Sequence, residues 1–164
     1  MGIAALAVLL LALGFMYFYN QNTKVVLSSE QTAYFPNDQI KVEVSIDNYK
    51  DANEASVIVN YPENAVFVDS NTEKGVTARS LDKAIVLEAD NSFFDSGKNK
   101  LGTINFDSNG NGEFVFTVDK ELTKLNSTKE NLDIKELVNL TVSVGIPSDG
   151  EEETKKADGS PLEL

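Results

Sequence analysis

Residues 39–47, QIKVEVSID, decide the fold, because apolar and polar side chains alternate along them without a break. The apolar set is Ile40, Val42, Val44 and Ile46, and the polar set is Lys41, Glu43, Ser45 and Asp47. Successive side chains of a β-strand point to opposite sides, so this pattern predicts a strand with one side on a core and the other in water. Such strands are typical of antiparallel sheets with one solvated face.

Other short segments on both sides of this strand have β-prone composition and are separated by turn residues. They are 24–28, 32–35, 54–61, 65–68, 76–80, 83–89, 101–106, 113–119 and 138–146. Residues 120–137 form the only longer excursion, which we expect to be helical or coil. We expect eight or nine strands from these segments, and they predict an all-β fold, an antiparallel two-sheet sandwich of the Ig-like or jelly-roll type, with a small barrel as the alternative.

The glycine-rich stretch 107–112, DSNGNG, separates two of these strands, 101–106 and 113–119. Short connections rich in asparagine and glycine are typical of β-hairpin turns, because both residues tolerate positive φ angles. The stretch therefore predicts that these two strands pair with each other as a hairpin.

The same stretch also resembles the beginning of a calcium-binding loop. Oxygen-bearing side chains stand at its first, third and fifth positions (Asp107, Asn109 and Asn111), and glycine stands at its sixth. The twelfth position is Val118, where such a loop needs a bidentate glutamate, so we favour the turn. A weaker calcium site that combines these residues with Asp69, Asp90 or Asp95 is the alternative.

Two sequence triplets match the acceptor for N-linked glycosylation. The first is Asn126-Ser127-Thr128, in the long excursion, and the second is Asn139-Leu140-Thr141, in the last predicted strand. Alternation along that strand places Asn139 and Thr141 on its outward side. Asn126 and Asn139 are therefore glycosylation candidates.

The composition excludes much of enzyme chemistry. The 164 residues include no histidine, cysteine or tryptophan, and Arg79 is the only arginine. An imidazole base, a thiol nucleophile, zinc ligands of the soft type and a disulfide framework are thus not available. Ser80 and Lys83 match the S-x-x-K pattern of a Ser-Lys dyad, but between two strands they predict a turn. We expect no catalysis and no cofactor.

The charge of the chain is strongly acidic. Its 26 acidic and 14 basic side chains, which give a net charge of −12, all lie from Lys24 onward. A surface of this sign repels nucleic acid and anionic lipid, so a nucleic-acid partner is not expected. The residues from 23 onward are enough for one domain with one core.

Residues 2–19, GIAALAVLLLALGFMYFY, contain no charge, proline or side-chain amide. As a helix they would extend about 27 Å, close to the roughly 30 Å of bilayer hydrocarbon. No small-x-small cleavage site follows, which favours a retained anchor over a cleaved signal peptide. An apolar surface on every side also suits the core of a fibre built from identical helices.

These observations predict three parts. Residues 1–22 form a transmembrane or filament-core helix, residues 23–146 form the β-sandwich domain, and residues 147–164 form an acidic C-terminal tail. The tail combines low hydrophobicity with high charge density, as linkers and disordered ends do.

Residues 35–48, FPNDQIKVEVSIDN, and 55–68, ASVIVNYPENAVFV, resemble the first third of cohesin-type and related Ig-like cell-surface domains. Those families have a turn that ends in aspartate before an alternating strand. A second strand then runs into a Tyr-Asp-Pro-like corner and a short apolar strand. The resemblance covers about 35 residues. It implies a jelly-roll or Ig-like sandwich displayed on a cell surface, without catalysis.

Two functions fit these predictions. The leading one is a membrane-anchored extracytoplasmic sandwich for adhesion, assembly or display, with a protein or carbohydrate partner at the cell surface. The alternative is a structural subunit of a pilus-like or archaellum-like filament, in which residues 2–19 pack with their copies in the fibre core and the β head lies outside. The predicted location is accordingly the cell membrane, with the C-terminal domain extracellular, or a cell-surface filament.

Overall fold

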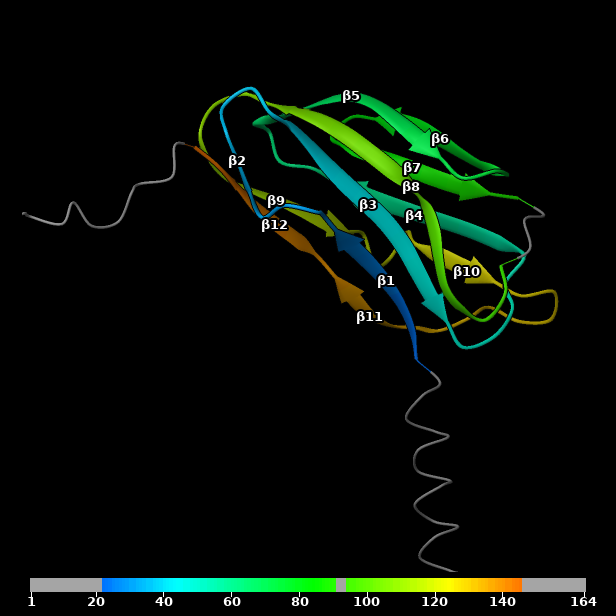
Figure 1. Cartoon of the computed structure of the whole chain (residues 1–164). Coiled ribbons are helices and arrows are strands. Elements are labelled where there is room, and N and C mark those ends of the chain that lie inside the picture. The colour runs from blue at the N-terminus through cyan, green and yellow to red at the C-terminus, as the bar shows by residue number, and fades with distance from the viewer. Residues whose placement is uncertain (1–21, 91–93, 146–164) are drawn as a thin grey trace, which may run out of the picture.

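The computed structural model describes residues 22–90 and 94–145, which form twelve β-strands in two facing sheets (Figure 1). The predicted N-terminal helix and the acidic tail lie outside the described residues, apart from Asn22. The described part contains no helix long and apolar enough to cross a membrane. The prediction of an all-β two-sheet sandwich is confirmed.

The first sheet has five strands in the order β11-β1-β3-β8-β5. Their bounds are β1 Thr23–Ser28, β3 Gln39–Asn48, β5 Ala65–Thr72, β8 Gly97–Ser108 and β11 Ile134–Val138. The predicted strand 39–47 is β3, and it lies in the centre of this sheet. Figure 1 shows β3 and β8 passing in front of the strands of the second sheet.

The second sheet has the order β2-β12-β9-β4-β7-β6, and a short strand, β10, also pairs with β4. Their bounds are β2 Ala33–Tyr34, β4 Glu54–Asn60, β6 Val76–Leu81, β7 Ala84–Ala89, β9 Gly112–Val118, β10 Lys124–Asn126 and β12 Leu140–Val144. Among the strands described, β1 with β11 and β2 with β12 are parallel pairs, and the other neighbours are antiparallel.

The core lies between the two sheets and is built by the alternation that the sequence shows. Ile40, Val42, Val44 and Ile46 of β3 are all 0% exposed. Phe114 and Phe116 of β9 meet them from the second sheet as fully buried side chains. Removing this much apolar surface from water is the main stabilising term of such a domain.

The predicted hairpin between residues 101–106 and 113–119 is wrong. Strand β8 pairs with β3 and β5 in the first sheet, whereas β9 pairs with β12 and β4 in the second. The reason is that both strands bury an aromatic face against the other sheet. The rings of Phe106 and Phe116 lie 4.9 Å apart across the core. Residues 109–111 thus connect two layers, and Gly110 and Gly112 take the positive φ angles of that crossing.

The count of eight or nine strands was too low for the described residues because several strands are very short. β10 and all of β11 except its last residue, Val138, lie within residues 120–137, where a helical or coil segment was predicted. The last predicted strand, 138–146, is divided at Asn139: β11 belongs to the first sheet and β12 to the second. Three- and five-residue strands carry too few alternations to be distinguished from loop.

The turn before β3 gives a first testable prediction. Asn37 has a φ of 75° between Phe35 and Asp38, whose backbone and side chain close the turn with two hydrogen bonds of 3.0 Å. Glycine adopts this conformation without a Cβ clash, so Asn37→Gly should raise the free energy of unfolding by about 0.5 kcal/mol, and Asn37→Ala should lower it by about 1 kcal/mol. Urea unfolding measures both values. Equal stabilities for the two variants would contradict the assignment.

Candidate functional site

The outer edge of the first sheet is charged, and its charges are paired. Lys24 Nζ of β1 lies 2.8 Å from Glu136 Oε2 of β11. This hydrogen bond, and secondly the negative charge of Glu136, raises the pKa of Lys24 above its usual value. Lys135 donates to Asp133 in the same way, and its pKa is also raised. All four side chains are well exposed, so these pairs contribute little to stability.

The centre of the same face is also polar. Lys100 Nζ lies 2.9 Å from Glu43 Oε2, and Asn105 donates to Asp69. Ser45, which the pattern places outward, is nevertheless fully buried between its cross-strand neighbours. Because Lys100 and Glu43 are already paired with each other, covering them by a partner gains little, whereas Ser45 Oγ has no hydrogen-bond partner among the described residues.

The outer face of the second sheet has a different character. Directly opposite residues of antiparallel strands share a face, and the register sets Arg79 of β6, Val86 of β7 and Ile58 of β4 in one row. Leu81, Ala84 and Asn60 form the next row. The alternate residues of these strands, such as Val57 and Leu87, point into the core.

Four aliphatic side chains thus gather outside the core: Ile58, Leu81, Ala84 and Val86. We call them the aliphatic face. Ala84 and Val86 are 7% and 2% exposed, although neither belongs to the hydrophobic core between the two sheets. Leu81 is 42% exposed. An exposed aliphatic side chain that lies beside other apolar side chains is typical of surfaces that bind another protein.

A turn extends this surface along β4. Asp119 N donates to Ile58 O at 2.9 Å, and Ile58 N donates to Thr123 Oγ1 at 3.2 Å. The turn 119–123 is therefore held against the backbone of Ile58, between the points where β9 and β10 pair with β4. Leu122, in this turn, is 57% exposed. It is an exposed aliphatic side chain in a turn that contacts the backbone of Ile58, a member of the aliphatic face.

Polar residues surround the aliphatic face. Arg79 forms an exposed ion pair with Glu88, at 3.4 Å, diagonally past Val86. Thr77 lies opposite Glu88, and Asn60 lies opposite Thr117 of β9. An apolar centre with a polar rim is the common arrangement of protein interfaces, and arginine is enriched in them.

The calcium candidates lie at one end of the sandwich. Asp107 is exposed at the end of β8, and Asn109 and Asn111 belong to the crossing to β9. Asp69 is close to them along the sheet, because it pairs with Asn105. No group of three or more His, Cys, Asp or Glu side chains in the described ranges 22–90 and 94–145 is arranged to hold a metal ion. Calcium binding by Asp107, Asn109 and Asn111 stays a prediction.

Two other acidic candidates are far from this end. Asp95 lies beside Asn48, at the opposite end of β3 from the residue that pairs with Asp107. The ten residues of β3 separate the two ends by about 30 Å. Asp90 follows β7, whose last residue pairs with Ala55 at the start of β4. Neither carboxylate can share an ion with Asp107.

The remaining candidates are placed as follows. Lys83 lies in the two-residue turn between β6 and β7, as the sequence predicted, and Ser80 lies near the end of β6. Asn126 is the last residue of β10 and is half-buried, and Asn139 is exposed between β11 and β12.

Sequence reasoning did not find the aliphatic face, although a signal was present. Residues 84–87, AIVL, are four consecutive apolar residues in a strand. A strand with one solvated face alternates, so a continuous apolar run indicates that both of its faces are covered or available for covering. All four are buried.

The arrangement of the domain defines its class: a two-layer, largely antiparallel β-sandwich whose last strands cross from one sheet to the other. No protein-family model matches the sequence, and no curated protein matches it. Solved structures do match in fold. The non-cellulosomal cohesin of the archaeon Archaeoglobus fulgidus superposes with a TM-score of 0.63 at 18% identity, covering 77% of this chain and 94% of that cohesin.

Two bacterial cohesins are similar to the same extent. The third cohesin of ScaC from Acetivibrio cellulolyticus, solved in complex with the ScaB dockerin, gives a TM-score of 0.65 at 12% identity and covers 76% of this chain and 99% of that one. The cohesin module of a family 33 glycoside hydrolase from Clostridium perfringens gives 0.64 at 11% identity, with 76% and 98% covered. The domain is therefore a cohesin-type β-sandwich by fold, as the resemblance implied.

Proposed function

We propose that this domain is a non-catalytic protein-binding module that serves adhesion, assembly or display at the cell surface. The observation that carries the proposal is the aliphatic face, in which the exposed side chain of Leu81 lies beside the buried side chains of Ala84 and Val86 and within a polar rim. The fold supports it, since the similar ScaC cohesin was solved with a dockerin bound. The partner is expected to supply an apolar side chain to the centre of the face and neutral or basic groups to its rim.

The hydrophobic segment 2–19 supports the placement of this domain outside a membrane. Its length and lack of charge suit one membrane crossing. The acidic domain behind it repels anionic lipid, so we expect the sandwich to stand away from the bilayer and present its faces to other proteins. Anchoring and display at the surface are parts of this proposal.

A filament subunit is the second candidate, because residues 2–19 are apolar on every side and would also suit a helix packed among its copies. Electron microscopy of native surface material separates the two. Filaments that contain this chain would contradict the simple anchor, whereas extraction only as a detergent-solubilised monomer would contradict the filament.

The binding face is tested by charge substitution. Leu81→Asp combined with Leu122→Asp places two carboxylates on the exposed part of the aliphatic surface, where burial by a partner would leave them unpaired. The partner is first identified as the surface protein that the wild-type chain retains in a pull-down. Calorimetric titration of that protein should then show at least tenfold weaker binding to the double variant than to the wild type. Folding should be nearly unaffected, since both leucines are largely exposed.

Val66→Asp is the matched control. Val66 is 51% exposed on β5, at the edge of the first sheet, so it has a similar exposure on the other layer. This variant should bind the partner as the wild type does. Equal losses for the control and the double variant, or no loss for the double variant, would contradict the assignment of the face.

A further inference from the structure

The two glycosylation triplets lie in different surroundings. From this difference we infer that Asn139 carries an N-linked saccharide and that Asn126 does not. The inference rests on the proposed function, because N-linked transfer requires that the domain be exported. The hydrogen bonds of the two asparagine side chains differ, and only one of the two amide nitrogens can carry a saccharide without loss of native contacts.

Asn139 lies where the chain leaves the first sheet and enters the second, between β11 and β12. Its Oδ1 accepts a hydrogen bond of 3.1 Å from Val118 N, the last backbone amide of β9. The side-chain oxygen thus accepts the hydrogen bond that a backbone carbonyl of a neighbouring strand would otherwise accept from β9, because the chain joins this sheet only after Asn139. Its Nδ2 has no partner among the described residues, and the residue is exposed.

A sugar on Nδ2 leaves this arrangement intact. The amide oxygen remains an acceptor after the substitution, so the bond from Val118 persists. Thr141 is exposed on the same side of the chain, while Leu140 between them points into the core. The cross-strand neighbour of Thr141 is Val115, itself 45% exposed, so no bulky element covers the acceptor hydroxyl.

Asn126 has no comparable freedom. Its Nδ2 donates to Glu54 Oε2 at 3.1 Å, and its backbone carbonyl oxygen accepts from Asn53 N at 3.0 Å. The residue is half-buried in β10, which pairs with the first residues of β4. A sugar at this Nδ2 would have to displace Glu54 from the amide.

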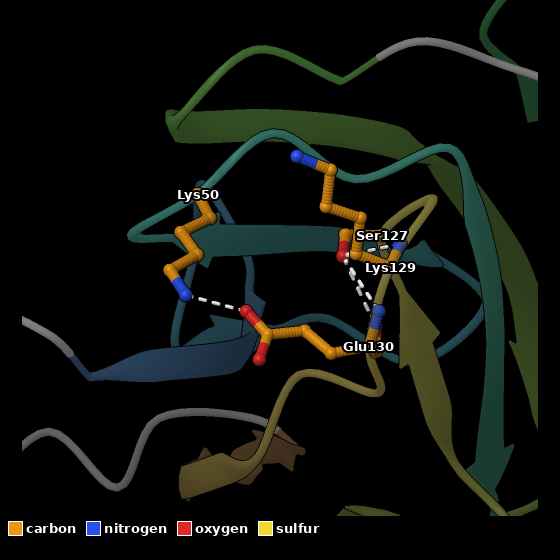
Figure 2. A network of polar contacts seen from close by, with 4 residues as sticks. All are labelled: Lys50, Ser127, Lys129 and Glu130. Carbon is orange, nitrogen blue, oxygen red and sulfur yellow. Dashed lines mark hydrogen bonds and ion pairs between the residues drawn. The ribbon is translucent and has the colours of Figure 1, made fainter.

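The turn that follows Asn126 is also closed. Ser127 Oγ accepts from Lys129 N at 3.3 Å and from Glu130 N at 3.1 Å, and it donates to Glu130 O. Figure 2 shows these bonds together with the exposed ion pair between Glu130 and Lys50, which connects the turn to the loop after β3. The triplet at Asn126 is thereby folded into a tight turn, whereas the triplet at Asn139 is extended.

The modification requires a saccharide carried on a lipid diphosphate as co-reactant. Nδ2 attacks the anomeric carbon, and the new carbon–nitrogen bond forms as the carbon–oxygen bond to the diphosphate breaks. The lipid diphosphate leaves with that electron pair, and one amide proton passes to a base of the transferase. Asn139 directly precedes β12, and β9 lies between β12 and β4 in the second sheet. The saccharide would therefore lie two strand spacings, about 10 Å, from β4 and would border the aliphatic face.

The experiment compares full-length chains produced in the source organism and purified from its surface membrane fraction. Intact mass spectrometry should show the wild type heavier than its sequence by one whole saccharide, and fragmentation should place it on Asn139. Thr141→Val, which keeps Asn139 and its bond to Val118, should lose the added mass, and Thr141→Ser should restore it. Thr128→Val is the matched control at the other triplet and should keep the mass.

Labelling of intact cells with a membrane-impermeant amine reagent separates the two proposals. A chain that is labelled but carries no added mass, or carries it on Asn126, would overturn the inference and leave surface display standing. A chain that is not labelled would overturn surface display itself. Added mass that survives Thr141→Val would likewise contradict the assignment to Asn139.

Discussion

Replacing Phe106 with alanine is expected to lower the free energy of unfolding by about 3–5 kcal/mol. Phe106 is fully buried, and its ring lies within 6.2 Å of three others: Tyr61 at 5.1 Å, Phe67 at 6.2 Å and Phe116 at 4.9 Å. Phe116 belongs to the other sheet, so the substitution leaves a cavity between the two layers. Aromatic contacts at these distances add to the loss of buried area.

Urea unfolding followed by circular dichroism measures this effect, since the chain contains no tryptophan as a fluorescent probe. Phe35→Ala is the matched control: Phe35 is 59% exposed in the turn before β3. Its change should stay below about 0.5 kcal/mol, as for ordinary surface substitutions. Similar losses for the two variants would show that Phe106 does not hold the sheets together.

The sequence was informative where a strand is long and one of its faces meets water. β3, β4 and β9 were predicted within about one residue, because their buried and exposed side chains alternate. β5 and β8 were predicted too short. Both carry polar residues in their outer halves, such as Asn71 and Lys98, which pair in the ladder although nothing apolar identifies them.

Strand pairing could not be predicted from local patterns. The stretch 107–112 has turn chemistry, but a turn between neighbouring strands and a turn between layers use the same residues. Only the burial of Phe106 against Phe116 across the core distinguishes them. The crossing at Asn139 was missed for a related reason, since Val138 of β11 continues the alternation of β12 in the sequence, although β11 and β12 pair in different sheets.

The candidate site depends on this long-range pairing. Ile58 and Val86 are 28 positions apart in sequence and become neighbours only through the register of β4 with β7. Each belongs to a strand whose other face is fully in the core, so either residue alone resembles an ordinary strand residue. The two glycosylation triplets, by contrast, were visible at once, but their difference lies in Glu54 and Val118, which are remote in sequence.

The outer faces of the two sheets differ in chemical character. The first sheet pairs several of its charges internally, as in Lys100 with Glu43, and exposes Val66 and Val68 only at its β5 edge, while the second sheet exposes Leu81 beside the buried Ala84 and Val86. A partner that covers the aliphatic face gains free energy from apolar burial without breaking existing pairs. Binding through the second sheet would leave the charged first sheet in water, which keeps the acidic module soluble beside its neighbours.

Gly102→Ala is expected to lower the free energy of unfolding by about 2–3 kcal/mol, as overpacking with a backbone shift does. Gly102 is buried in β8, opposite Val44 of β3 and Thr72 of β5. A Cβ at this position would lie 2.7 Å from Asn71 O and 3.0 Å from Thr72 Cα. Both atoms are backbone, so no side-chain rotation relieves the clash, and β5 must move away from β8.

Gly145→Ala separates this clash from the general effect of replacing glycine. A Cβ at Gly145 meets nothing within 4 Å, and its φ is not in the left-handed region. Alanine there restricts the unfolded chain without a clash, so stability should stay the same or rise by up to about 1 kcal/mol. If Gly102→Ala were also neutral, β5 would not be packed against β8 as closely as the structure shows. Since β5 is an edge strand, hydrogen exchange of its amides should report the loosening caused by Gly102→Ala before the rest of the domain unfolds.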